Sequence, residues 1–249
     1  MLKKRIVPAL DMMGGKVVKS VNFINFSEIG DPLTIAKAYE SQGADEIVFL
    51  DITATHEKHD THFAFIKQAA SELNIPVTAA GGIRGMEDIR KLFDCGAEKI
   101  SITSAAVLNP DLIKRASDEF GSERIIVAVD CMRVDGRYKL FIKGGRENTG
   151  LDLVEYLKKF EALGAGEIMV NSMDGDGTQN GYDIEMTKTV MGNVNIPVIA
   201  SGGCGEVKHI IEVFRQTDCA AALVASMLHY GKATIGDIKR ELEKENIPC

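Results

Sequence analysis

Short runs of β-branched and other apolar residues alternate along the chain with longer segments whose apolar residues recur at helical spacing. Eight such runs predict strands, at residues 6–7, 47–50, 77–78, 100–102, 125–127, 168–170, 198–199 and 222–224. Because these runs are too apolar for a sheet with one face in water, the strands should be parallel and buried on both sides. Eight alternating strands and helices predict an α/β fold, a (β/α)8 TIM barrel, with a doubly wound open sheet as the alternative.

Two motifs recur half a chain apart. Residues 43–47 reappear in similar form at 164–168, and residues 75–82 reappear at 196–203, both at an offset of 121. A shared offset near half the chain length indicates two similar halves of four strands rather than many small repeats. We therefore predict a single domain over 1–249, made of half-barrels at about 1–120 and 121–249.

The connections after the first and fifth strands differ from the rest. Asp135 and Gly136 lie between two β-like runs and predict a hairpin, which would form a small ribbon over the barrel mouth. The glycine-rich stretch 13–23 is longer than the usual connection of about 2–6 residues and predicts a loop that acts as a lid. Lys19 on this loop would reach a substrate or, alternatively, stand in solvent. Helix ends follow ordinary capping chemistry, as where Asp31 precedes Pro32.

Composition and charge remove several classes of protein. With 249 residues, 45% hydrophobic and 26% charged, the chain can bury a core and is not a disordered protein. A net charge of -7 argues against nucleic acid or an anionic membrane as a partner. The sequence shows neither an apolar run of about 20 residues nor a signal peptide, so a cytoplasmic protein is expected. Five cysteines without a CxxC pair predict neither a disulfide scaffold nor a cysteine zinc site.

Two aspartates directly follow predicted strands. Asp11 comes after residues 6–10 and Asp130 after residues 125–129, and an offset of 119 makes them near counterparts in the two halves. Catalytic groups of such barrels stand where strands end, so the two carboxyl groups should face each other across the mouth. Facing carboxyl groups can serve as general acid and general base when their surroundings separate their pKa values. The alternative is that each aspartate only caps its loop.

Glycines and hydroxyls also recur after matching strands of the two halves. They are Gly81, Gly82, Thr103 and Ser104 in the first half, and Ser201, Gly202, Gly203, Ala225 and Ser226 in the second. Glycines let backbone N–H groups approach phosphate oxygens, and hydroxyls add donors. Two such sites predict a substrate with a phosphate at each end, although Gly-Gly can also simply close a tight turn.

Three histidines and a group of charged residues complete the candidates. His56, His59 and His62 lie three apart, but Asp60 and Thr61 between them are typical of a helix cap, so no metal site is predicted. At the starts of strands, on the opposite side of the barrel from the aspartates, stand Arg5, Glu46, Lys99 and Glu167. Residues at the bottom of such a barrel usually serve stability, so we expect these four to form salt bridges that close the bottom as a plug.

Several of these motifs together resemble the family of cyclase subunits of imidazole glycerol phosphate synthase, an enzyme of histidine biosynthesis. The resemblance covers essentially the whole chain. It is carried by residues 4–6 and 10–11, 15–19, 22–23, 30–32, 49–54, 121–122 and 129–130, 174–178 and 199–203.

The resemblance implies that ammonia attacks the ribulosyl carbonyl of a phosphoribulosyl-formimino-aminoimidazole-carboxamide ribonucleotide. The products are imidazole glycerol phosphate and an aminoimidazole carboxamide ribonucleotide, and no cofactor is expected. Asp11 and Asp130 would be the acid and base, Lys19 an active-loop residue and the doubled Gly and Ser sites the phosphate clamps. To this set we add Asn171, Asp176 and Gly177 as substrate-binding residues.

The resemblance also implies a glutaminase partner that docks on the barrel bottom and sends ammonia through the core. Arg5, Glu46, Lys99 and Glu167 would then form a gate for ammonia.

Three positions depart from the family pattern: Ala9 replaces a cysteine, Ala80 a glycine and Thr103 an asparagine. Together with Asn171 and Cys131 they leave open a paralogous subunit that amidinates surface sugars, whereas Asp11 favours the histidine pathway. Two further alternatives are the sister isomerase that makes this substrate and a weakly catalytic subunit that mainly activates a glutaminase.

Overall fold

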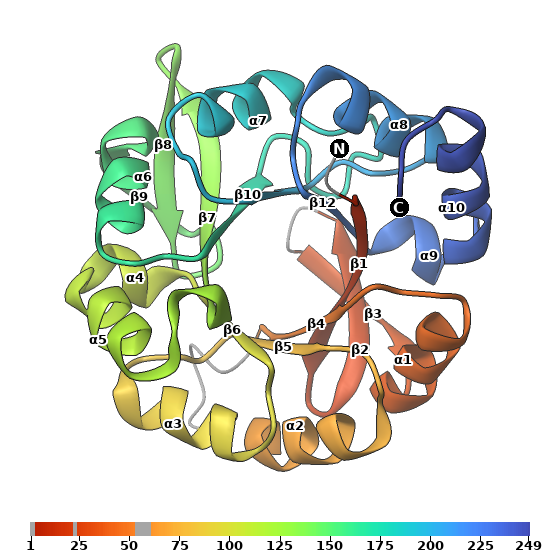
Figure 1. The fold of residues 1–249 in the computed structure, drawn as a ribbon, viewed down its shortest axis with the longest axis horizontal. Coiled ribbons are helices and arrows are strands. Elements are labelled where there is room, and N and C mark those ends of the chain that lie inside the picture. The colour runs from red at the N-terminus through yellow and green to blue at the C-terminus, as the bar shows by residue number, and fades with distance from the viewer. Residues whose placement is uncertain (1–2, 22–23, 53–60) are drawn as a thin grey trace.

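The computed structural model describes residues 3–21, 24–52 and 61–249. Within these ranges, eight parallel strands form a closed ring (Figure 1). In ring order they are β1 (Arg5–Met13), β4 (Ile47–Asp51), β5 (Val77–Ala80), β6 (Lys99–Ile102), β7 (Ile125–Val134), β10 (Glu167–Ser172), β11 (Val198–Ser201) and β12 (Ala221–Val224). Pairing of β12 with β1 closes the ring. The predicted TIM barrel is confirmed, and the open-sheet alternative is wrong.

Helices surround the ring of strands (Figure 1). They are α1 (Pro32–Ser41), α2 (Thr61–Glu72), α3 (Met86–Asp94), α4 (Ser104–Leu108), α5 (Asp111–Phe120), α6 (Leu153–Ala162), α7 (Ile184–Met191), α8 (Val207–Gln216), α9 (Ser226–His229) and α10 (Ile235–Lys244), with a 3-10 turn, η1 (Ser122–Arg124). The predicted cap of α1 is confirmed, since the Asp31 carboxylate accepts from the Thr34 N–H at 2.8 Å. None of the described helices is long and apolar enough to cross a bilayer.

The strands alternate between two apolar clusters. On β1, Ile6 and Leu10 belong to the larger cluster between strands and helices, whereas Val7 and Ala9 belong to a smaller one. Because side chains alternate along a strand, the smaller cluster fills the inside of the barrel. Arg5 and Asp11 alternate along β1 in step with Val7 and Ala9, so their side chains also point into the barrel. On this strand, a charged residue therefore stands at each end of the barrel interior.

Two antiparallel ribbons extend the barrel at its carboxyl end. β8 (Arg137–Ile142) pairs with β7 and then with β9 (Glu147–Asp152), and the predicted hairpin is confirmed by the pairing of Val134 with Arg137. Asp135 and Gly136 at this turn both have positive φ, 48° and 78°.

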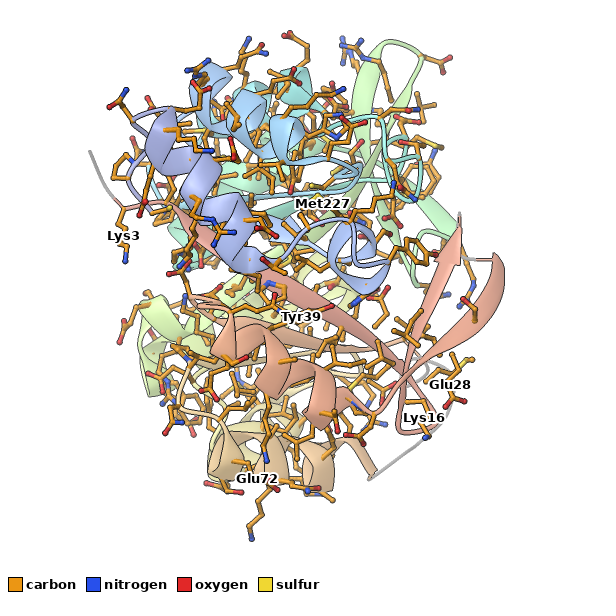
Figure 2. All side chains as sticks on the ribbon, turned by 90° about the vertical axis from the view of Figure 1, so that its right-hand side faces the viewer. Lys3, Lys16, Glu28, Tyr39, Glu72 and Met227 are labelled. Atoms are coloured by element: carbon orange, nitrogen blue, oxygen red, sulfur yellow. The ribbon has the colours of Figure 1, made fainter. Side chains whose placement is uncertain are left out.

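The second ribbon consists of β2 (Lys16–Val21) and β3 (Ile24–Gly30), and it corrects the predicted loop over 13–23. β1 continues past the barrel and turns at Gly14 and Gly15, whose positive φ values suit a tight hairpin. Figure 2 shows Lys16 and Glu28 of this ribbon at the opposite end of the barrel from Lys3. The ribbon therefore stands at the barrel mouth.

Element for element, the order from β1 to α5 repeats from β7 to α10, apart from η1. Each half begins with a barrel strand that continues into a ribbon and ends with two consecutive helices. This order supports half-barrels at about 1–120 and 121–249 within one domain, which stays a prediction.

Candidate functional site

A cavity opens at the carboxyl ends of the strands, where the predicted site residues meet. Of the predicted residues it is lined by Asp11, Gly81, Gly82, Thr103, Ser104, Asp130, Asn171, Asp176, Gly177, Ser201, Gly202, Gly203, Ala225 and Ser226. Lys19 falls on β2, but its side chain lies outside the described residues, so its approach to a substrate stays a prediction.

The two predicted catalytic aspartates lie on β1 and β7 at the cavity, shortly before each strand continues into its ribbon. Asp130 is half-buried, and its carboxyl lines the cavity, where the surrounding protein replaces part of the water that would solvate the charge. Burial raises the pKa of Asp130 to about 6, partly offset by a hydrogen bond from Asn171 and reinforced by the charge of Asp176. The carboxyl of Asp130 can therefore gain or lose a proton near neutral pH.

The glycines after β5 and β11 are required by close backbone approach. Gly81 has φ +86°, and a Cβ there would lie 2.1 Å from the carbonyl oxygen of Asp51. Gly202 has φ +90°, and a Cβ would lie 2.6 Å from the carbonyl oxygen of Ser172. Both glycines thus close a tight turn, as the alternative to phosphate binding predicts. Both also place backbone without a side chain on the cavity wall, so the two roles are compatible.

The serine sites of the two halves have similar backbones. Thr103 and Ala225 precede α4 and α9 with φ, ψ values of -109°, -93° and -128°, -80°. Ser104 and Ser226 therefore begin short helices at matching places on the cavity wall. The Ser104 hydroxyl also accepts a hydrogen bond from the Lys143 N–H at 2.9 Å, which ties α4 to the ribbon after β7.

At the opposite end of the barrel, the four predicted charged residues form one ion-pair network. Arg5 Nη1 lies 2.8 Å from Glu46 Oε2, and Arg5 also pairs with Glu167. Lys99 Nζ lies 3.1 Å from Glu46 and 3.3 Å from Glu167. Burial of Arg5 opposes its charge, but the carboxylates of Glu167 and Glu46 outweigh that effect and raise its pKa. Each cation is thus shared by two buried carboxylates.

Comparison with known proteins identifies the family. A family model described as histidine biosynthesis protein matches residues 5–234. Imidazole glycerol phosphate synthase subunit HisF of Lactococcus lactis subsp. lactis (strain IL1403) is 56% identical over 251 residues, which cover 100% of this chain and 97% of the relative. The chain belongs to the HisF family. The HisF subunit of Bacillus cereus (strain Q1) is 51% identical over 248 residues, covering 99% of this chain and 98% of the relative. The resemblance seen in the sequence is confirmed.

Ala80 and Thr103, two of the departures from the HisF pattern, both line the cavity. Ala80 is the last residue of β5, and it does not share the positive φ of Gly81. A methyl group is therefore tolerated at position 80. Thr103 precedes α4 and makes no side-chain cap hydrogen bond, so its hydroxyl is not committed to that helix.

Several cavity residues are not predicted from the sequence, and Arg146 is the one with a positive charge. Arg146, in the turn between β8 and β9, lines the cavity together with Gly144. Two cations flank a Gly-Gly pair at 143–146, which is a signal for a loop that approaches an anion. The ribbon was predicted from the turn at 135–136, but the return turn was not.

The histidine cluster provides no metal site among the described residues. His62 lies at the start of α2 with a buried ring, 4.0 Å from an Asp51 oxygen, and burial lowers its pKa. His56 and His59 lie outside the described residues. In the part of the chain that the structure describes, no three His, Cys, Asp or Glu side chains are grouped to hold a metal. The absence of a metal in this HisF-family chain stays a prediction.

Proposed function

We propose that the barrel mouth cyclises phosphoribulosyl-formimino-aminoimidazole-carboxamide ribonucleotide with ammonia, as the cyclase subunit of imidazole glycerol phosphate synthase in histidine biosynthesis. The observation that carries this is the pair of aspartates at equivalent strand ends in a HisF-family barrel. Attack of ammonia on the ribulosyl carbonyl requires a proton for the oxygen and removal of protons from the nitrogen. A carboxyl that titrates near neutral pH, as Asp130 does, is suited to such transfers, with Asp11 as its counterpart.

The two loop pairs are proposed as clamps for the two substrate phosphates. In each half, a glycine turn and a serine at the start of the next short helix line the same cavity. Backbone N–H groups and hydroxyls are suited to phosphate oxygens, and they discriminate little between the two ends of a bisphosphorylated substrate. Arg146 would add a positive charge to this wall.

The charged network is proposed as an ammonia gate facing a glutaminase. The relatives are named as synthase subunits, which supports an assembly with another subunit. Above the network the barrel interior is mostly apolar, but Glu46 Oε1 and the Thr78 hydroxyl are buried in it without a hydrogen-bond partner among the described residues. These acceptors would bind a small donor such as ammonia on its way to the mouth.

Turnover with added ammonium salt tests the cyclase function. The isolated full chain should form imidazole glycerol phosphate from the substrate and ammonium without a glutaminase, because ammonium salt supplies ammonia directly to the mouth. A chain that forms no product, but accelerates glutamine hydrolysis by a cognate glutaminase, would instead be the weakly catalytic activator. Isomerisation of the precursor of this substrate would indicate the sister isomerase, and amidination of a sugar would indicate the paralogue.

A further inference from the structure

Three polar side chains stand level on neighbouring strands of the second half. Asp130 on β7 pairs in register with Asn171 on β10, and Asn171 pairs with Ser201 on β11. Level residues on adjacent parallel strands point to the same side of the sheet, and all three line the cavity. Asn171 Nδ2 donates to Asp130 Oδ1 at 3.1 Å, and Ser201 Oγ donates to Asn171 Oδ1 at 3.1 Å. The hydroxyl thereby keeps the amide nitrogen turned toward the carboxyl.

The first half has apolar residues at the matching places. Asp11 on β1 is level with Leu50 on β4, and Leu50 is level with Ala80 on β5. Leu50 and Ala80 each precede their polar counterparts, Asn171 and Ser201, by the 121 positions of the internal repeat. Neither a leucine nor an alanine side chain can donate a hydrogen bond. The repeat therefore gives the two aspartates the same position but different neighbours.

We propose that Asn171 and Ser201 form a positioning relay that orients the carboxyl of Asp130, so that Oδ1 is held by the amide and Oδ2 exchanges the proton with substrate. The relay rests on the proposed cyclase function and adds to it the two residues that orient one of the carboxyls. Asp130 receives its donor from Asn171 on the neighbouring strand. Asn171 and Ser201 act through Asp130, so they are positioning residues.

The electrostatics of the cavity give the relay a measurable effect. Among the described side chains, the charged groups that line the cavity with Asp130 are Asp11, Asp51, Asp176 and Arg146. Burial and the charge of Asp176 raise the pKa of Asp130, and the hydrogen bond from Asn171 lowers it. The amide thus keeps Asp130 ionised at a lower pH than burial alone would allow.

Carboxyl titration of the full chain without substrate tests the relay. Aspartate is labelled with carbon-13 at its side-chain carboxyl, and Asp130→Asn and Asp11→Asn assign the two signals. We expect Asn171→Leu to raise the titration midpoint of Asp130 by roughly one pH unit or more, because a hydrogen bond to the charged form is lost. Ser201→Ala should raise it by roughly half a pH unit, because the amide is no longer held in one orientation, and Ser201→Thr should restore it.

The midpoint of Asp11 in the same samples is the internal control and should stay within about 0.3 pH unit of the wild-type value. An unchanged Asp130 midpoint in Asn171→Leu, or an equal movement of both midpoints, would overturn the relay. If Asn171→Leu does not fold, an unchanged Asp130 midpoint in Ser201→Ala would overturn it alone.

Kinetics then separate the relay from the proposed function. The acidic limb of kcat with added ammonium should move upward in Asn171→Leu by the same amount as the Asp130 midpoint, with little change in KM. A wild-type chain without ammonium-dependent turnover would refute the cyclase function, while the substrate-free titration still decides the relay. A midpoint that moves while the acidic limb does not would show that Asp130 is oriented but does not set the rate, which overturns the catalytic part of the proposal.

Discussion

The two ends of the barrel interior hold their charged residues in different ways. At the bottom, Arg5 and Lys99 stand between Glu46 and Glu167, and each charge is balanced by partners of opposite sign. At the mouth, the carboxyl of Asp130 accepts its hydrogen bond from a neutral amide, and its pKa lies near 6. A charge balanced by an ion pair holds structure, whereas a carboxyl with a neutral partner in a poorly hydrated cavity is poised to transfer protons.

The largest effect is expected at the mouth. Asp130→Asn and Asp11→Asn should each lower kcat with added ammonium by about 10²–10⁴-fold, because an amide keeps the shape but cannot exchange the proton. Asp118→Asn, an exposed aspartate on α5, is the matched control and should leave kcat unchanged. Near-normal kcat in both mouth variants, with circular dichroism showing an intact fold, would remove the two aspartates from the mechanism.

Parts of this comparison could be predicted from the sequence and parts could not. The barrel, its two ends and the paired aspartates followed from local signals: apolar runs, strand ends and an offset of 119 between Asp11 and Asp130. The hydrogen bond from Asn171 to Asp130 could not be predicted, because it depends on the register between β7 and β10, which are 41 residues apart along the chain. Strand register is set by the packing of the whole barrel rather than by residues near Asn171.

The β2–β3 ribbon was wrongly predicted as a loop for a different reason. Gly14 and Gly15 predict a loop by composition, but they form the hairpin turn between β1 and β2. Val17, Val18 and Val21 are β-branched residues, which are typical of strands. Glycine content alone therefore did not distinguish a lid loop from a tight hairpin.

The second effect is on the free energy of unfolding, and it concerns the charged network at the bottom of the barrel. Glu46→Ala should lower it by about 3 kcal/mol or more, since Arg5 and Lys99 would lose one of their two buried partners. Glu72→Ala, which removes a comparatively exposed pair with Lys37, is the matched control and should lower the free energy of unfolding far less. Denaturant unfolding measures both variants, and equal losses would mean that the bottom network is no stronger than a surface pair.

Asp130→Asn should raise the free energy of unfolding, whereas Glu46→Ala lowers it. The pKa of Asp130 is higher in the folded chain than its ordinary value of 3.8, so folding disfavours the charged form. The stability that this carboxyl contributes is present below its ordinary pKa and is lost as the pH rises through about 6. At pH 7, Asp130→Asn should therefore raise the free energy of unfolding by on the order of 1 kcal/mol. A loss of stability at pH 7 would contradict the conclusion that burial destabilises the charged carboxyl of Asp130.

The third effect concerns the phosphate clamps at the mouth. Ser104→Ala and Ser226→Ala should each raise KM roughly tenfold, because each removes one hydroxyl donor to a charged phosphate. Ser71→Ala, on the exposed side of α2, is the control and should leave KM unchanged. Binding of inorganic phosphate, followed by amide shifts in the full chain, should weaken at the altered site while the site in the other half is retained. Unaltered KM and phosphate binding in both variants would remove the serines from the clamps.

The smallest effect on cyclisation, but the most specific one, is expected for Lys99→Ala at the bottom. A plug and a gate predict different results, because removing one partner from a plug costs stability, whereas opening a gate lets ammonia escape. Lys99 has two carboxylate partners that Arg5 also contacts, so Arg5 continues to neutralise them in the variant.

We expect turnover with added ammonium to stay within about twofold of wild type, since supplied ammonia enters from the mouth. With a cognate glutaminase and glutamine, more glutamate than imidazole glycerol phosphate should form, and measuring both products in one reaction gives the ratio. A ratio that stays one to one, together with a large drop in Tm, would establish the plug and exclude the gate.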